Sequence, residues 1–191
     1  SGVKAWSNTG GLDIVDYKLA GDTPLTIDLS KTGAQNTGFG TATFRNIEGL
    51  AGGHSADIFV DNAADNQFEG RGGNDNLILT GGGRDTLLYK LLAASDATGG
   101  NGSDDVYAFE VGAFAAWPNA DRIDVRELLV GFTPANEASY LKVSVVNGRD
   151  TVISVDRDGA DGGFDFAPLL TLRGVQTDLA TLLANQQLVM V

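Results

Sequence analysis

The chain has 191 residues and carries 25 acidic against 13 basic residues, for a formal net charge of −12. This charge disfavours nucleic acid as a partner, because phosphate binding requires positive charge, and it suits a cation. The absence of cysteine excludes disulfides and thiolate metal sites, and no apolar run reaches the roughly 20 residues that a membrane-spanning helix needs.

Residues 1–50 are predicted to form irregular turns that precede and extend the fold of the glycine-rich segment after residue 50. The stretches 12–17, LDIVDY, and 25–29, LTIDL, alternate apolar and polar residues, as half-buried strands do. The stretch 44–53, FRNIEGLAGG, leads into a glycine-rich region. The abrupt Ser1-Gly2 start suggests that the chain is a piece of something longer.

Residues 51–105 hold 11 of the 26 glycines and nine acidic residues against three basic ones. A disordered linker is one interpretation of such a composition. Against it, the segment also carries Phe59, Phe68, Leu77, Leu87 and Val106, which a solvated linker does not need. The segment is therefore expected to fold around these apolar residues.

A nine-residue frame, G-G-x-G-x-D-x-U-x with U a large apolar residue, runs through this region. Five segments lie on it: 52–60, 61–69, 70–78, 80–88 and 99–107. The last fits at every fixed position. Ser55, Arg71 and Thr80 each replace one glycine in an otherwise intact frame. In the degenerate frame 61–69 only Phe68 remains, with Asn66 where aspartate belongs.

These frames resemble the RTX (repeats-in-toxin) calcium-binding nonapeptides. The resemblance implies a mostly β fold: a right-handed parallel β-roll (β-solenoid) with a small α+β C-terminal cap. Six residues of each frame would form a turn and three a strand, with the U residue between two sheets. Successive turns would alternate sides, so that each stacks on the turn about 18 residues further on.

Stacked turns predict calcium ligands, because calcium takes 6–8 oxygens from carboxylates and carbonyls. Asp57 and Asp75, 18 residues apart, are expected to pair. On the other side Asn66, Asp85 and Asp104 are spaced by 19, and Asp85 with Asp104 is the preferred pair there because Asn66 is neutral. Several Ca²⁺ ions are expected.

Carbonyls at frame positions two and four complete the predicted sites. They belong to Gly53, Ser55, Asn62, Ala64, Arg71, Gly73, Gly81, Gly83, Gly100 and Gly102. Asp96 either caps the Asp75 column or lies in a loop, and Asp105 is expected to be a solvent-facing strand residue. Without metal the carboxylates repel and the glycines keep their entropy, so metal binding and folding are predicted to be one event.

Residues 108–191 predict a mixed cap. The stretch 121–129, DRIDVRELL, predicts a short helix capped by Asp121 or Asp124. YLKVSVV and TVISVD flank Asn147-Gly148, a strong hairpin signal. A strand at 168–172, a helix at 177–187 with Thr177 or Asp178 as N-cap, and a final strand in LVMV complete the cap.

The stretch 156–165, DRDGADGGFD, places Asp156, Asp158 and Asp161 at a glycine-rich hairpin end. It is not an EF-hand loop, because Gly159 stands at position four and Ala167 at position twelve. A turn with solvated charges and an additional calcium site both remain open.

Catalytic signals are poor. The stretch 53–57, GHSAD, begins like a serine nucleophile elbow, but Asp57 replaces the closing glycine, and His54 is the one histidine. The nonapeptide frame accounts for the same residues. We therefore expect a protein that is not an enzyme.

The pieces DRIDVRELL, YLKVSV, VISVDRDG, LLTLRGV and LATLLANQQLV resemble the C-terminal target region of large type I secreted adhesins. The resemblance implies an uncleaved C-terminal secretion signal read by an ATP-driven transporter, and a location outside or on the surface of a Gram-negative bacterium. The expected organisation is upstream turns at 1–50, the calcium-binding roll at 51–107, and the cap and signal at 108–191. We expect a monomeric piece of a longer chain, without membrane insertion.

Two alternatives stay open. The same roll aids export and refolding of a secreted enzyme or toxin, or it binds a ligand directly. What precedes Ser1, tandem immunoglobulin-like repeats or a catalytic domain, would separate the adhesin from the enzyme or toxin.

Overall fold

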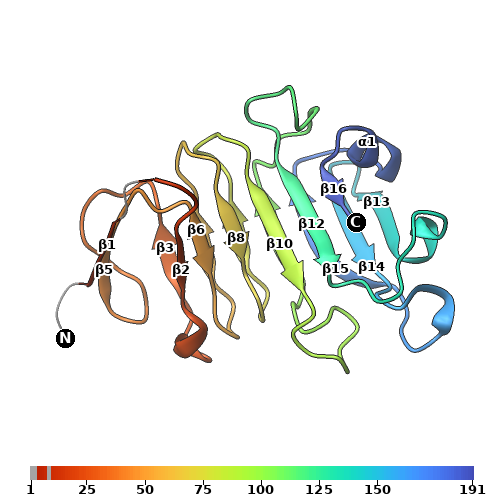
Figure 1. The fold of residues 1–191 in the computed structure, drawn as a ribbon, viewed down its shortest axis with the longest axis horizontal. Helices are drawn as coiled ribbons and strands as arrows, with labels where there is room; N and C mark the ends of the chain where they lie inside the picture. Colours follow the sequence, from red (N-terminus) through yellow and green to blue (C-terminus); the bar gives the residue numbers. More distant parts are fainter. Residues whose placement is uncertain (1–3, 8–9) are drawn as a thin grey trace.

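Short strands stack side by side along the long axis of the molecule in a computed structural model that describes residues 4–7 and 10–191 (Figure 1). Ser1 and Gly2 lie outside the described residues. The six-stranded sheet contains β2 (Ile14–Asp16), β6 (Gly49–Ala51), β8 (Gln67–Glu69), β10 (Thr86–Lys90), β12 (Arg122–Glu127) and β16 (Leu188–Val189). The seven-stranded sheet contains β3 (Thr26–Asp28), β7 (Ile58–Val60), β9 (Asn76–Ile78), β11 (Asp104–Tyr107), β13 (Leu141–Val146), β14 (Asp150–Val155) and β15 (Ala167–Arg173).

From β6 to β12 the chain changes sheet at every strand, and all the strand pairs along this stretch are parallel. This alternation is consistent with a solenoid-like fold. The mostly β fold and the sharing of strands between two sheets, parallel over this stretch, agree with the prediction.

The U residue of every frame lies in the core between the sheets. In one sheet the register aligns Ile27, Phe59, Leu77, Val106 and Leu172. In the other it aligns Val15, Leu50, Phe68, Leu87, Ile123 and Leu188. All of them are buried, and the rings of Phe59 and Phe68 contact each other at 5.9 Å between centroids. Alternation along the strand therefore sends the central residue of three-residue strands such as β7 and β9 inward and its neighbours to the outer face.

The upstream segment extends both sheets. β2 pairs in parallel with β6, and β3 with β7. β1 (Lys4–Ser7), β4 (Gln35–Asn36) and β5 (Thr41–Arg45) form a separate three-stranded sheet, and η1 (Lys18–Ala20) is a short 3₁₀ turn. The strands predicted within 12–17 and 25–29 are thus present.

The downstream segment also joins the sheets. β13 and β14 form the predicted hairpin, and β15 connects it to β11. The helix α1 (Leu179–Ala184) begins after Asp178, whose carboxylate accepts the Thr181 N–H at 2.7 Å. The 3₁₀ turns η2 (Glu137–Ser139) and η3 (Gly159–Asp161) lie in connections. No helix in the described ranges is long and apolar enough to cross a membrane.

The helix predicted at 121–129 is wrong, because this stretch forms β12. Ile123 and Val125 are buried, and β12 pairs in parallel with β10 on one side and β16 on the other. A strand with partners on both sides satisfies its backbone hydrogen bonds through the sheet, and this outweighs the weak local preference for a helix.

Candidate metal sites

Three aspartates from successive turns on one side stack in a first column, consisting of Asp57, Asp75 and Asp104. The Asp57 N–H donates to Asp75 Oδ1 at 2.7 Å, and the Asp75 N–H donates to Asp104 Oδ1 at 2.9 Å. The Leu25 N–H donates to Asp57 Oδ1 at 2.9 Å, so the ladder reaches the upstream turn. All three carboxylates are buried. Asp57 and Asp75 stack as their spacing of 18 predicts.

A second column on the other side consists of Asn66, Asp85 and Asp121. The Asn66 N–H donates to Asp85 Oδ1 at 2.7 Å, and the Asp85 N–H donates to Asp121 Oδ1 at 3.0 Å. The Asn66 amide is held within the protein, since its Nδ2 donates to the Glu48 carbonyl and its Oδ1 accepts the Asn62 N–H.

The predicted pairing of Asp85 with Asp104 is wrong. Asp85 precedes β10 and Asp104 begins β11, which belong to different sheets. The 19 residues between them contain one change of sheet plus an excursion after β10, closed by the N–H groups of Leu92 and Ala93 on the Gly99 carbonyl. The excursion takes up as many residues as a second turn would, but the chain changes sheet only once. Asp104 therefore stacks on Asp75, 29 residues away.

Two buried carboxylates escaped the sequence reasoning. Asp121 stacks on Asp85 from 36 residues away and stands in no frame, so only a count of sheet changes would have located it. Asp61 occupies the first-glycine position of the degenerate frame, and both of its carboxylate oxygens accept the Gly81 N–H, at 2.7 and 2.8 Å. An acidic residue at a position that normally holds glycine is the sequence feature that could have identified Asp61.

Two carboxylate oxygens in the columns are buried without any hydrogen-bond donor: Asp75 Oδ2 and Asp85 Oδ2. The corresponding oxygens of their neighbours are satisfied. Asp57 Oδ2 accepts the Gly53 N–H, Asp104 Oδ2 accepts the Tyr89 hydroxyl at 2.9 Å, and Asp121 Oδ2 accepts the Glu110 N–H. A buried anionic oxygen without a donor requires a proton or a cation, because leaving it unpaired is costly.

The glycines of the frames let the backbone approach these oxygens. A Cβ on Gly70 would lie 2.1 Å from Asp75 Oδ2, and one on Gly52 would lie 2.3 Å from Asp57 Oδ2. Gly52 and Gly70 therefore leave the space into which the aspartate of their own frame folds. A side chain at either position would displace the carboxylate.

The turns whose carbonyls are predicted to bind calcium also stack. A Cβ on Gly73 would lie 2.6 Å from the Ser55 oxygen, one on Gly83 2.3 Å from the Ala64 oxygen, and one on Gly102 1.7 Å from the Gly73 oxygen. At position two, Gly81 lies against Asn62 in the same way, the Gly53 carbonyl accepts the Gly72 N–H, and the Gly100 carbonyl faces Gly72. The turns that carry these carbonyls are thus stacked in close contact with one another.

The two columns suit a metal ion that also binds backbone carbonyls, as calcium does, better than an ion held by side chains alone. Among the residues that the structure describes, no group of three or more His, Cys, Asp or Glu side chains could hold a metal. A cation at Asp75 or Asp85 would therefore take carboxylate oxygens together with backbone carbonyls, which calcium accepts. Beside Asp85 and Asp121 a cavity of about 350 Å³ is lined by the 81–83 glycines.

Burial dominates the electrostatics of both columns. It raises the pKa of the Asp85 carboxyl to about 8 and that of Asp121 to about 7, and the charges of neighbouring carboxylates add to both effects. Burial, with the Asp104 charge beside it, likewise raises the pKa of Asp75. Metal-free columns therefore hold protons near neutral pH, and a cation would displace them.

We expect the metal-free protein to lose stability as the pH rises from about 5 to about 8. The folded-state pKa values are raised above the unfolded value of about 3.9, so this contribution is complete below that value and disappears as the pH passes through about 7 to 8. In saturating calcium the trend reverses, because the metal binds the deprotonated form. Urea denaturation across this range, in chelator and in calcium, measures both slopes; parallel slopes would contradict the prediction.

Tyr89→Phe removes the one hydrogen-bond donor to Asp104 Oδ2 among the described residues and is expected to cost about 1–3 kcal/mol of unfolding free energy. The same substitution at the more exposed Tyr107, in β11, is the control and is expected to stay within about 0.5 kcal/mol. Denaturant unfolding of both variants in chelator compares them. Equal small effects would show that Asp104 does not depend on the Tyr89 hydroxyl.

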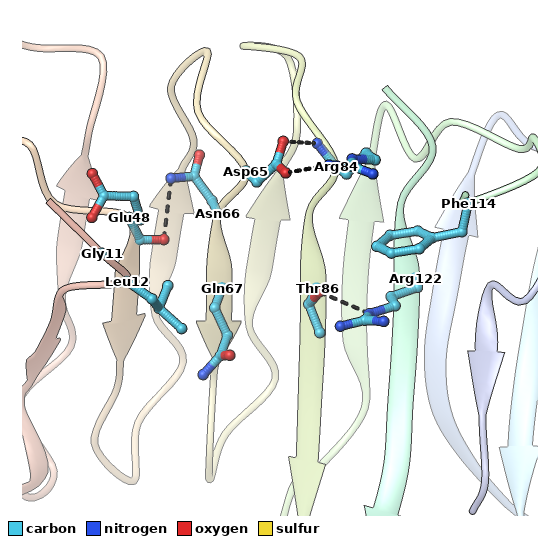
Figure 2. Close-up of a pocket in the computed structure, with 10 residues that line it drawn as sticks. All are labelled: Gly11, Leu12, Glu48, Asp65, Asn66, Gln67, Arg84, Thr86, Phe114 and Arg122. Carbon is cyan, nitrogen blue, oxygen red and sulfur yellow. Dashed lines mark hydrogen bonds and ion pairs between the residues drawn. The ribbon is translucent and has the colours of Figure 1, made fainter. Parts of the chain in front are cut away.

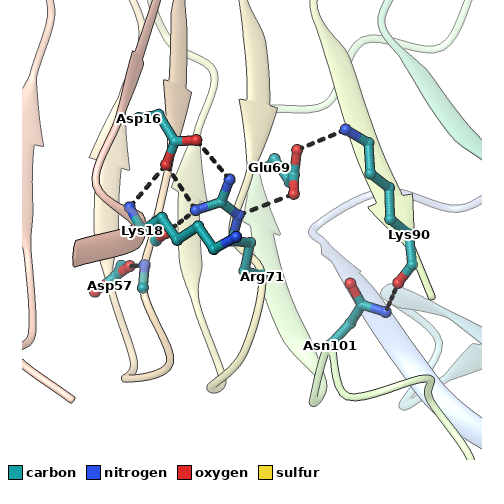
Figure 3. A network of polar contacts seen from close by, with 9 residues as sticks. Asp16, Lys18, Asp57, Glu69, Arg71, Lys90 and Asn101 are labelled. Carbon is teal, nitrogen blue, oxygen red and sulfur yellow. Dashed lines mark hydrogen bonds and ion pairs between the residues drawn. The ribbon is translucent and has the colours of Figure 1, made fainter. Parts of the chain in front are cut away.

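Arg71, at the second-glycine position of its frame, adopts a left-handed φ of +67° and directs its side chain onto the outside of the sheet (Figure 3). Its guanidinium bonds Asp16 at 2.7 Å and Glu69 at 3.0 Å, and Glu69 also pairs with Lys90 at 3.0 Å. The network joins β2, β8 and β10, so this replacement of glycine supports the stack through its side chain.

Asp96 takes the loop alternative. Its carboxylate accepts the N–H groups of Thr98 and Gly100 and the Thr98 hydroxyl, within the excursion. Asp105 is only partly exposed, because Arg173 forms an ion pair with it at 2.7 Å. Neither side chain joins a carboxylate column.

A groove of about 500 Å³ lies on the outer face of the six-stranded sheet (Figure 2). Gln67, Thr86 and Arg122 align across its floor, each beside an inward-facing U residue or its equivalent. Arg84 pairs with Asp65, whereas Arg122 stacks on Phe114 at 4.4 Å, donates to the Thr86 hydroxyl, and has no acidic partner among the described side chains. The groove thus presents one guanidinium that forms no ion pair among the described side chains, and Glu48 is a further charged residue of its lining.

No family model matches the chain, and no curated protein matches it. Among solved structures, the chain is similar to the AlgE6R2 subunit of the mannuronan C5-epimerase from Azotobacter vinelandii, with 22% identity over 94% of this chain and 92% of that one, at a TM-score of 0.30. At this TM-score the similarity supports no inference, and the assignment below depends on the geometry of the chain itself.

Proposed function

We propose that the chain is a calcium-binding β-roll module of a type I secreted adhesin of a Gram-negative bacterium, without enzymatic activity. One observation carries the calcium part: Asp75 Oδ2 and Asp85 Oδ2 are buried without a donor, one in each carboxylate column. The ions would be held by Asp57, Asp75 and Asp104 on one side and by Asp85 and Asp121 on the other, with carbonyls of the glycine turns. Calcium would neutralise the negative charge of these buried carboxylates.

Calcium would couple folding to location. Extracellular calcium modules bind at about 10⁻⁴–10⁻³ M, so the sites would be empty in a cytosol and filled outside. Without metal, the buried carboxylates disfavour the stacked turns, and the chain would cross an exporter unfolded. The resemblance of 121–191 to adhesin target regions supports recognition of this segment by the transporter.

Calcium titration of the whole chain, followed by circular dichroism, tests the metal-coupled folding. We expect the strand signal, the compaction and the resistance to urea to increase with calcium and to decrease in chelator. The same spectrum in both conditions would overturn the proposal.

Co-expression with an adhesin-type transporter tests export. Secretion is expected with the active transporter and not with one deficient in ATP hydrolysis. Retention of the chain in cells containing the active transporter would leave a roll attached to another class of secreted protein, an enzyme or toxin, as the alternative.

The groove favours a second candidate, direct binding of an anionic ligand. Arg122 offers a guanidinium without an ion pair among the described side chains, next to the Phe114 ring, in a cavity large enough for a sugar. A glycan array probed with the calcium-loaded chain and with Arg122→Gln tests it. Binding of acidic glycans that Arg122→Gln loses would support this function, and no binding would remove it.

A further inference from the structure

The loop between β14 and β15 contains a second type of buried carboxylate group, away from both columns. Asp156 is only 7% exposed, and its Oδ1 has no hydrogen-bond partner. Asp158 Oδ1 is also buried and without a partner, while its Oδ2 accepts the Gly163 N–H at 3.0 Å. The Asp158 carboxyl lies against that of Asp156, and burial together with this neighbour raises the pKa of Asp156.

No cation among the described side chains forms an ion pair with either carboxylate. Arg157, between them in sequence, turns away: its guanidinium donates to the carbonyls of Ala94 and Asp96 and stacks on the Phe164 ring at 4.1 Å. The described ion pairs include neither Asp156 nor Asp158. The chain thus uses its nearest arginine to attach the loop to the excursion after β10.

Glycines close the loop around the two carboxylates. A Cβ on Gly163 would lie 2.4 Å from Asp158 Oδ2, and one on Gly159, at φ +65°, would lie 2.6 Å from the Tyr140 ring. Tyr140 itself is near the pair, since the charges of Asp156, Asp158 and Asp161 help to raise its pKa. The loop therefore closes tightly around the two carboxylates and places the Tyr140 ring beside them.

We propose that Asp156 and Asp158 hold a calcium ion in this loop, independently of the nonapeptide columns. Two facing carboxylates with buried, donorless oxygens supply the charge, and backbone carbonyls and water would complete the 6–8 oxygens that calcium takes. Because Arg157 lies between the two ligands, the ion would also fix the contact of the hairpin with residues 94–96. The site would order the C-terminal region as the columns order the roll.

Counting bound calcium by native mass spectrometry tests the site. Asp156→Asn combined with Asp158→Asn is expected to bind one ion fewer than the wild type. Asp165→Asn, an exposed carboxylate of the same loop, is the matched control and is expected to keep the full number. The ions in the columns are counted in the same spectrum, so failure of this site is distinguishable from failure of the proposed function. An unchanged number in the double variant would overturn the inference and leave a shared proton as the partner of the pair.

Terbium luminescence provides a readout that does not alter the carboxylates. Tb³⁺ bound in the loop is expected to be sensitised by Tyr140, so Tyr140→Phe should lose the part of the emission that the double variant loses. Calcium should compete for it. Full emission from a folded Tyr140→Phe protein would contradict the proposed position of the ion, even if the double variant failed to fold.

Discussion

Replacing Asp75 and Asp85 together by asparagine is expected to remove most of the stability that calcium adds to the protein. Each asparagine keeps the oxygen that accepts the N–H of the preceding turn, but it removes the charge at the donorless Oδ2. A site filled at 100 times its dissociation constant contributes about 2.7 kcal/mol, so two sites contribute about 5 kcal/mol. That calcium-dependent gain is the quantity expected to disappear.

The same variant should be more stable than the wild type when metal is absent at mildly alkaline pH. Burial raises the pKa of both aspartates, so their ionisation in the folded state opposes folding, and asparagine cannot ionise. The two effects have opposite signs, which separates a metal-ligand role from a merely structural one.

Chemical denaturation in chelator and in saturating calcium measures both effects. Asp22→Asn is the control, because its side chain is 94% exposed and the substitution removes a carboxylate by the same chemical change. This control is expected to change neither value by more than about 0.5 kcal/mol. If the double variant gains as much stability from calcium as the wild type does, the columns are not the calcium sites.

Gly102→Ala is expected to be the most damaging single substitution in the roll, costing about 4 kcal/mol or more, or preventing folding altogether. Gly102 has φ +73°, and a Cβ there would lie 1.7 Å from the Gly73 carbonyl oxygen. The obstacle is backbone from the neighbouring turn, which cannot rotate away. The column from Asp75 to Asp104 would have to separate.

Gly148→Ala isolates the conformational part of this cost. Gly148 lies in the β13–β14 hairpin at φ +61°, with nothing within 4 Å of an added Cβ. Its substitution should cost only the left-handed penalty of about 1–2 kcal/mol. Thermal and urea unfolding of both variants give the difference, and equal costs would show that the turns carrying Gly73 and Gly102 do not stack.

Much of the roll could be read from the sequence because its determinants are local. The nine-residue period identified every U residue, and Phe59, Phe68, Leu77, Leu87 and Val106 all lie in the core. The spacing of 18 placed Asp57 on Asp75, and Asn147-Gly148 located the hairpin. In each case the positions are linked by consecutive frames without an insertion or by a two-residue turn, where chain length decides the geometry.

The remaining site geometry depended on contacts between distant segments. The excursion after β10 lengthened one turn, so a 19-residue interval that suggested a stack joined residues of opposite sheets, and Asp104 and Asp85 took Asp75 and Asp121 as neighbours. The stretch 121–129 became a strand because β10 and β16 offered it two parallel partners. Sequence by itself determined the repeating turn and the residues that point inward. Only the tertiary structure decided which turn lies on which, because stacking is set by the number of sheet changes between two residues and not by their separation along the chain.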